Sequence, residues 1–195
     1  MKVYFKTFGC RTNIYDTELL KSYVKNYEIV NDDNIADIIV VNSCTVTNGA
    51  DSGVRNYINS MRNSGKKVIL TGCGAVSKGD ELFKSSAIFG VLGASNKSKI
   101  DEMLGKSEPF YELGDLNFID KNIVSNYENH TKAFIKIQEG CDFACSYCII
   151  PSVRGFSRSI DEDIILKEAK ILASNGYSEI VLTGTNIGSY GKGNN

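Results

Sequence analysis

The sequence predicts an α/β protein whose N-terminal part is a doubly wound parallel sheet. Short apolar runs rich in β-branched residues alternate with segments whose apolar residues recur at helical spacing. Continuous apolar runs are typical of parallel strands that are buried on both faces. The expected strands are residues 3–7, 38–41, 68–70 and 88–92. This strand–helix alternation favours one parallel sheet with helices on both sides.

Helices are expected between these strands. The first follows the polar residues Thr12 and Asn13 and carries Leu19, Leu20 and Tyr23 on one face. The second has the clearest apolar stripe of the chain, which predicts a helix with one face against the sheet. Its residues are Ala50, Val54, Tyr57, Ile58 and Met61.

A second strand–helix series begins after residue 131. Residues 133–137 are expected to form a strand, and Ser159 with Glu162 resembles a capping box that opens a helix. The helix is expected to run through about Asn175, and residues 180–182 form the next strand.

The two series divide the chain into an N-terminal domain over 1–105, a linker over 106–131 and the first part of another domain over 132–195. The linker loses the periodic pattern and is rich in Gly, Asn and Asp. Two strands do not make a stable α/β domain. We therefore expect the sequence to be the N-terminal piece of a longer protein.

The composition indicates a folded protein without a membrane segment. Apolar residues make up 42% and charged residues 23% of the 195-residue chain, as in ordinary globular proteins. No run approaches the roughly 18 apolar residues of a membrane span, and the N-terminus lacks the apolar core of a secretory signal. We therefore predict a cytoplasmic protein with no membrane association. The net charge of −1 predicts that any contact with nucleic acid is local.

Three of the six cysteines lie close together in the second half of the chain. Cys141, Cys145 and Cys148, the loop cysteines, form a C-x3-C-x2-C pattern directly after an expected strand. This spacing places three thiolates around one compact centre, and thiolates hold iron–sulfur clusters. On a four-iron cluster, three ligands leave one iron open. The alternatives are a zinc site completed by His130, and cysteines with no metal role.

The other three cysteines are far apart in sequence. Cys10, Cys44 and Cys73, the strand-end cysteines, each fall just beyond an expected strand, with gaps of 34 and 29 residues. Because a βαβ unit takes about 30 residues or more, cysteines with this spacing converge on one edge of a parallel sheet. They could hold a second cluster with one open iron. The alternative is three unrelated, half-buried cysteines.

Short motifs surround both cysteine sets. They are Gly-Cys-Arg-Thr-Asn at 9–13, Asn-Ser-Cys-Thr-Val-Thr at 42–47, Thr-Gly-Cys at 71–73, Cys-Asp-Phe-Ala-Cys-Ser-Tyr-Cys-Ile-Ile-Pro at 141–151 and Arg-Gly-Phe-Ser-Arg-Ser at 154–159. The loop cysteines, with an aromatic residue before the third, resemble the signature of the radical S-adenosylmethionine (radical SAM) superfamily. The whole set resembles the radical SAM methylthiotransferases, and the resemblance covers nearly the whole chain.

The resemblance implies two [4Fe–4S] clusters and S-adenosylmethionine as cofactors. The loop cysteines would bind the cluster that cleaves S-adenosylmethionine, and Tyr147 would lie near its adenine. The strand-end cysteines would bind an auxiliary cluster whose open iron holds the sulfur to be delivered. The second domain would be the start of a radical SAM (βα) partial barrel. The later barrel strands and the family's small RNA-binding barrel are absent from this sequence.

The resemblance also implies a substrate class. Known branches of the family act on threonylcarbamoyladenosine in tRNA, on isopentenylated adenosine in tRNA, and on an aspartate of a ribosomal protein. Arg11-Thr12-Asn13 most resembles the first branch, the MtaB type. The implied partners are tRNA and an electron donor such as flavodoxin or ferredoxin. A non-catalytic, metal-stabilised module is the alternative from another class of function.

Two arginines and one turn complete the candidates. Arg154 and Arg158 follow the loop cysteines and would pair with a phosphate or with the carboxylate of the cofactor. Solvated or structural arginines are the alternative. Residues 183–186 end an expected strand and either approach the cofactor or form an ordinary βα turn.

Overall fold

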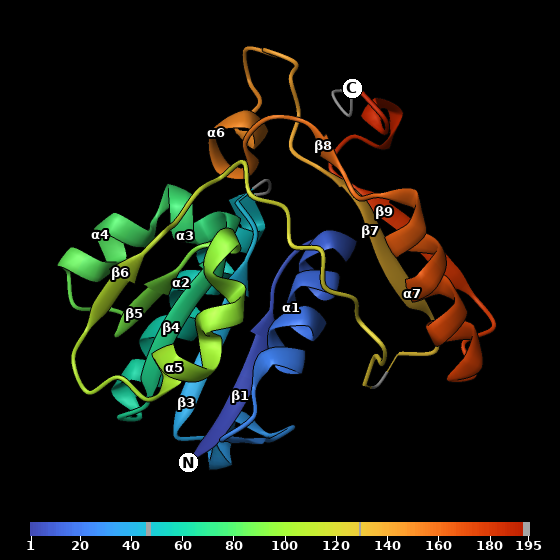
Figure 1. Ribbon diagram of the computed structural model, residues 1–195. Helices are drawn as coiled ribbons and strands as arrows, with labels where there is room; N and C mark the ends of the chain where they lie inside the picture. Colours follow the sequence, from blue (N-terminus) through green and yellow to red (C-terminus); the bar gives the residue numbers. More distant parts are fainter. Residues whose placement is uncertain (46–47, 129, 193–195) are drawn as a thin grey trace.

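The computed structural model describes residues 1–45, 48–128 and 130–192, which contain two β-sheets (Figure 1). The larger sheet has six parallel strands in the order β2-β1-β3-β4-β5-β6. Its strands are β1 (Lys2–Thr7), β2 (Glu28–Ile29), β3 (Ile38–Ser43), β4 (Lys67–Gly72), β5 (Gly90–Leu92) and β6 (Phe110–Glu112). The strand order reverses between β1 and β3. Open α/β sheets bind ligands at such a point, beyond the carboxyl ends of the strands.

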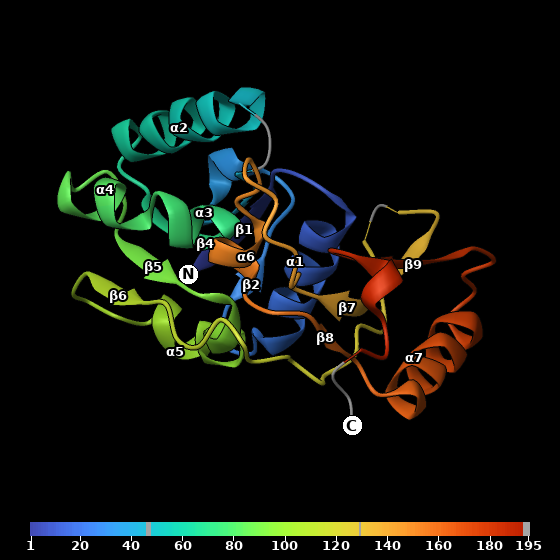
Figure 2. The same ribbon diagram turned by 90° about the horizontal axis from the view of Figure 1, so that it is seen from above.

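Helices cover both faces of the larger sheet (Figures 1 and 2). They are α1 (Arg11–Tyr23), α2 (Asn48–Asn63), α3 (Cys73–Ser77), α4 (Gly79–Lys84) and α5 (Ile100–Leu104), with short 3-10 turns at Asp33–Ile35 and Ala94–Lys99. Ile39 of β3 packs in one apolar cluster with Ile58 of α2. The next residue, Val40, packs in the opposite cluster with Leu20 of α1 and Met103 of α5. Alternate residues of one strand enter two cores, which confirms the predicted doubly wound arrangement.

The smaller sheet has three strands in the order β8-β7-β9. β7 (Ala133–Glu139) and β9 (Ile180–Gly184) are parallel and are joined by α7 (Glu162–Ser174), as the predicted second series requires. The short strand β8 (Arg158–Ser159) is antiparallel to β7. Helix α6 (Ile150–Arg154) follows the cysteine loop, and a 3-10 turn at Ile187–Ser189 follows β9.

Helix α1 lies between the two sheets (Figure 1). Leu20 faces the larger sheet, whereas Tyr15 and Leu19 pack in a third apolar cluster with Ile135 of β7 and Leu172 of α7. One helix therefore belongs to the cores of both domains, and its burial fixes their relative position.

The segment expected to be a linker is more ordered than its sequence indicates. Residues 110–112 form β6, which pairs with β5 and extends the larger sheet. Further along, Val124 and Tyr127 are buried against α1 and β7. Two isolated apolar residues in a polar stretch carry no periodic pattern, so the sequence does not indicate this burial.

Two predicted helix starts are wrong. Helix α7 begins after Asp161, and Ser159 lies in β8 opposite Gln138 of β7, where its hydroxyl accepts a hydrogen bond from the amide of Gly191 (2.9 Å). Strand pairing therefore replaces the expected capping box. Helix α1 begins at Arg11, one or two residues before the expected polar start at Thr12 and Asn13. No helix in the described part of the chain is long and apolar enough to cross a membrane.

Candidate metal and cofactor site

The carboxyl ends of three neighbouring strands each lead to a cysteine. β1 leads to Cys10, β3 to Cys44 and β4 to Cys73. All three line one cavity of about 480 Å³. The second domain supplies the other side of this cavity with Ile150, Arg154, Gly184 and Thr185. The fold therefore brings the strand-end cysteines together at the switch point, in the place where an α/β sheet binds its ligand.

Two glycines allow the cysteine loops to approach one another. Gly9 has a φ of +123°, and a Cβ at this position would overlap the side chain of Cys44. Gly72 has a φ of +79° directly before Cys73, and a Cβ there would overlap the side chain of Asn42. Because other residues rarely adopt such backbone angles, glycine is required at both turns.

Two buried asparagines fasten the first two loops together. The amide group of Asn13 donates to Asn42 Oδ1 (3.0 Å) and to the carbonyl of Ser43 (3.2 Å). In return, the amide group of Asn42 donates to the carbonyl of Asn13 (2.9 Å) and to Thr17 Oγ1 (3.0 Å). Asn13 lies in the first turn of α1, as expected, but its side chain does not cap the helix. Its Oδ1 accepts a hydrogen bond from Cys10 Sγ (3.2 Å), and its amide holds the segment just before Cys44. The only sequence signal that Asn13 and Asn42 join these loops is their place within the cysteine motifs at 9–13 and 42–47. Val46 and Thr47 of the second motif lie outside the described residues.

The thiol of Cys73 contacts a side chain from the other domain. Cys73 is 3% exposed, and its Sγ accepts a hydrogen bond from Arg154 Nε at 3.0 Å. Burial raises the pKa of the Cys73 thiol, and the adjacent guanidinium opposes this rise because it favours the thiolate. Arg154 therefore provides a positive charge and an N–H donor at one of the three strand-end sulfurs.

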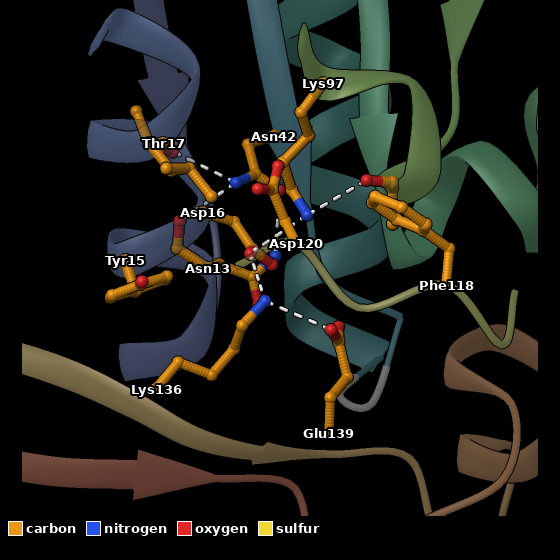
Figure 3. A network of polar contacts seen from close by, with 12 residues as sticks. Asn13, Tyr15, Asp16, Thr17, Asn42, Lys97, Phe118, Asp120, Lys136 and Glu139 are labelled. Atoms are coloured by element: carbon orange, nitrogen blue, oxygen red, sulfur yellow. Dashed lines mark hydrogen bonds and ion pairs between the residues drawn. The ribbon is translucent and has the colours of Figure 1, made fainter. Parts of the chain in front are cut away.

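Asp16, Lys97, Lys136 and Glu139 form a buried network of charges between the domains (Figure 3), and Arg154 pairs with both of its carboxylates. Asp16 of α1 pairs with Lys136 of β7 (2.7 Å), Lys97 (3.3 Å) and Arg154 (2.8 Å). Glu139 at the end of β7 pairs with Lys136 (3.1 Å) and Arg154 (2.5 Å). Each of these five side chains is at most 5% exposed. The sequence does not indicate the pairs of Asp16 with Lys136 and Arg154, because their partners are 120 and 138 residues apart.

The cations in this network outweigh the effect of burial on both carboxyl groups. Burial alone would raise the pKa of Asp16, but Lys136, Lys97 and Arg154 hold it well below its usual range. The pKa of Glu139 is lowered in the same way, mainly by Lys136 and Arg154 against burial. Both carboxyl groups are therefore ionised at neutral pH.

The loop cysteines lie on an open surface beyond the carboxyl end of β7. Cys145 is exposed, Cys141 and Cys148 are half-buried, and Tyr147 is 92% exposed. The backbone amide of Cys141 donates to the carbonyl of Gly155 (3.1 Å), which ties the start of the loop to the end of α6. The loop therefore has a fixed base and an accessible tip.

The other candidates from the sequence are Arg158 and the turn after β9. Arg158 donates to the carbonyl oxygens of Phe118 (3.0 Å) and Arg154 (2.7 Å) and pairs with Glu139 (3.5 Å), so it also holds the end of α6. Binding of a cofactor by Tyr147, Arg154 and Arg158 stays a prediction. Gly184, the last residue of β9, and Thr185, which follows it, line the cavity of the strand-end cysteines.

His130 does not complete a metal site with the loop cysteines. Its ring contacts the edges of Tyr127 and Phe134 near the start of β7, whereas the loop cysteines follow the end of that strand. In the described ranges, no three His, Cys, Asp or Glu side chains lie close enough to hold a single metal ion.

The strand-end cysteines fit a larger metal centre. All six cysteines are free thiols. Three of them surround one cavity, supported by an N–H donor and by a buried excess of positive charge. Iron–sulfur clusters are held by thiolates and are tuned by hydrogen bonds to sulfur. The donor set and its surroundings therefore suit a cluster bound by three cysteines.

Comparison with known protein families agrees with this chemistry. Residues 135–193 match the model of the radical SAM superfamily, and residues 2–93 match "Uncharacterized protein family UPF0004". The fold resembles that of TsrM from Kitasatospora setae, a radical S-adenosylmethionine methyltransferase, with a TM-score of 0.64 and 14% identity over 96% of this chain and 48% of that one. The C-terminal part of the chain is thus a radical SAM domain.

The names of similar proteins indicate which family of radical SAM proteins the chain resembles. A Helicobacter pylori protein named "Putative methylthiotransferase" is 51% identical over 98% of this chain and 46% of its own length. The threonylcarbamoyladenosine tRNA methylthiotransferase MtaB of Aquifex aeolicus is 39% identical over 98% of this chain and 49% of its own length. The tRNA-2-methylthio-N(6)-dimethylallyladenosine synthase of Fervidobacterium nodosum is 33% identical over 98% and 46%, respectively. The chain belongs to the radical SAM methylthiotransferase family and spans about half the length of these relatives. The family implies S-adenosylmethionine and two [4Fe–4S] clusters as cofactors.

Proposed function

We propose that the protein transfers a methylthio group to a tRNA adenosine, using two [4Fe–4S] clusters and S-adenosylmethionine. The observation that carries this proposal is the cavity at the switch point. Its walls come from the three strand-end cysteines and from the segments that follow β7 and β9 in the radical SAM domain. One domain therefore presents its sulfur ligands to the catalytic side of the other.

Each of the two sets of cysteines holds a different cluster in this proposal. The loop cysteines hold one cluster at the accessible tip of their loop, and Tyr147 receives the adenine of the cofactor. The strand-end cysteines hold the other cluster, with Asn13 and Asn42 keeping two of their loops in register. When bound, the clusters and S-adenosylmethionine supply a carbon radical and the sulfur that is transferred.

Metal analysis tests this division. After anaerobic reconstitution, we expect about eight iron and eight sulfide per chain, as for two four-iron clusters. Replacing the strand-end cysteines with alanine should halve the iron and leave cleavage of S-adenosylmethionine intact. Four iron in the parent protein, with no effect of these substitutions, would contradict the two-cluster arrangement. So would stoichiometric zinc with no 5′-deoxyadenosine formed on reduction.

The proposed substrate is threonylcarbamoyladenosine in tRNA. Arg11-Thr12-Asn13 beside Cys10 supports this branch. Overall identity does not separate the two tRNA branches, because the MtaB relatives are 34–39% identical and the dimethylallyladenosine synthases 33–36% identical. The alternatives are isopentenylated adenosine in tRNA and an aspartate of a ribosomal protein. Nucleoside analysis of tRNA from a deletion strain separates the three. Loss of the methylthio derivative of threonylcarbamoyladenosine supports the proposal, and unchanged tRNA assigns the ribosomal protein.

The proposal implies partners and a compartment. Because the chain spans about half the length of its relatives, we place most tRNA contacts outside residues 1–195. Reduction of the clusters requires an electron donor such as flavodoxin or ferredoxin. Both partners belong to the cytoplasm. Pull-down of the electron donor by the reconstituted protein tests the second partner.

A further inference from the structure

Arg154 connects the two sets of cysteines through a short path. It is the last residue of α6, the helix that follows Cys148 directly. Helix α6 packs against α3, whose first residue is Cys73, and the guanidinium of Arg154 reaches the sulfur of that cysteine. A single side chain therefore joins the segment after one cysteine set to a member of the other.

The orientation of this guanidinium is fixed from both domains. Its Nη1 donates to Asp16 of α1 (2.8 Å) and to Glu139 of β7 (2.5 Å), while its Nε points to Cys73. A guanidinium is planar with donors in fixed directions, so contacts on two of its nitrogens determine where the third edge points. Both carboxylates are themselves held by Lys136 (2.7 and 3.1 Å).

We infer that Arg154 is a positioning residue that sets the spacing and the relative orientation of the two cysteine sets. The inference rests on the proposed function only in treating both sets as cluster ligands. The buried carboxylates of Asp16 and Glu139 hold the guanidinium of Arg154 in place. Arg154 in turn contacts α3 through Cys73 and is itself the last residue of α6. Without Arg154, all six cysteines remain, but the side chain that joins α6 to Cys73 of α3 is lost.

The charge balance of the network supports this role over a purely structural one. Four cations, Lys97, Lys136, Arg154 and Arg158, surround Asp16 and Glu139. After removal of Arg154, each carboxylate still has a lysine partner, so a neutral substitution leaves no carboxylate unpaired. The carboxylates therefore do not need Arg154 for charge neutralisation, and its positive charge can act on the sulfur of Cys73, which its Nε contacts.

Hydrogen exchange before iron is added tests the inference independently of any cluster. In Arg154→Gln, we expect the backbone amides of α3 and α6 to exchange at least tenfold faster than in the parent protein, with α7 unchanged. The control is Arg62→Gln, at an exposed arginine near the end of α2, which should change none of these rates. Equal rates in Arg154→Gln and the parent protein would overturn the inference.

Electron paramagnetic resonance of the reconstituted, reduced protein tests the geometry. Arg154→Gln should keep its iron but show a weaker magnetic interaction between the two clusters than the parent protein. Arg154→Lys should restore the slow exchange, because an ammonium reaches the carboxylates, yet it should not restore the interaction, because it lacks the second donor edge. An unchanged interaction in both variants would overturn the inference. If the parent protein holds one cluster, the proposed function fails, while the exchange rates still decide the role of Arg154.

Discussion

The two cysteine sets differ in how the protein organises them. The strand-end cysteines come from three loops, and two of them, Cys44 and Cys73, are at most 6% exposed. The loop cysteines lie within eight consecutive residues, and their loop carries the almost fully exposed Tyr147. The protein therefore arranges three cysteines in two ways. One uses sequence spacing on an accessible loop, and the other uses a sheet edge and a buried network.

The largest expected effect separates the two sets by function. Cys145→Ala should reduce formation of 5′-deoxyadenosine to background, because its cluster would lose one of three ligands. Cys73→Ala should leave that reaction within a few-fold of the parent protein and abolish methylthio transfer. Quantifying both products for each variant by mass spectrometry checks the contrast. Loss of both products in both variants would mean that the two sets do not act separately.

The second effect concerns the stability of the buried network. Asp16→Asn should lower the free energy of unfolding by about 3–5 kcal/mol, because it leaves buried cations without their carboxylate. Denaturant unfolding followed by circular dichroism measures the change. The matched control is Asp80→Asn, which removes an exposed ion pair with Lys84 and should leave stability unchanged. Equal stability of the two variants would show that the network does not hold the domains together.

The third effect is a dependence of stability on pH from Glu168 of α7. Burial raises the pKa of this carboxyl from 4.5 to about 7, against weaker opposing effects of the Val124 amide, the Tyr15 hydroxyl and Lys136. The native state therefore binds this proton more tightly than the unfolded state. As pH rises from about 4.5 through about 7, the free energy of unfolding should fall by about 3 kcal/mol.

Glu168→Gln tests this effect because glutamine has the same shape and does not ionise. We expect urea unfolding of the variant to lack this part of the pH dependence and to exceed the stability of the parent protein above about pH 7. The hydrogen bond from the Val124 amide has an oxygen to accept it in both proteins. Parallel pH profiles would show that Glu168 is ionised in the native state at neutral pH.

The smallest effect lies on the exposed loop. Tyr147→Ala should leave the melting temperature unchanged, because the side chain is 92% exposed. It should weaken binding of S-adenosylmethionine about tenfold, since stacking of a base on an aromatic ring contributes about 1–3 kcal/mol. Isothermal titration of the reconstituted protein measures the affinity. Unaltered affinity would remove Tyr147 from the cofactor site.

Local patterns carry much of the fold and part of the site. The apolar runs around Val40 and Ile69 predict buried parallel strands because burial on both faces requires continuous apolar sequence. The loop cysteines can be recognised as a set from the sequence because all three lie within eight consecutive residues. The convergence of the strand-end cysteines follows from the same logic, since parallel strands separated by one βαβ unit end at one sheet edge.

Other features depend on partners that are distant in sequence. Ser159 resembles a helix cap but pairs with β7, and Phe110 lies in an expected linker but extends the sheet. Asn13 lies in the first turn of α1 as expected, but its side chain joins two loops and does not cap the helix. In each case a tertiary hydrogen bond or strand pair decides the role of the residue.

The sequence by itself determined the α/β class, the strand ends that carry cysteines and the compact spacing of the loop set, because each depends on residues near one another in the chain. The tertiary structure alone decided the contacts between the domains. Asp16 meets Lys136 and Arg154 only because α1 is packed between two sheets, and charges that are 120 and 138 residues apart in sequence carry no local pattern. The contact between Arg154 and Cys73 is therefore visible only in three dimensions.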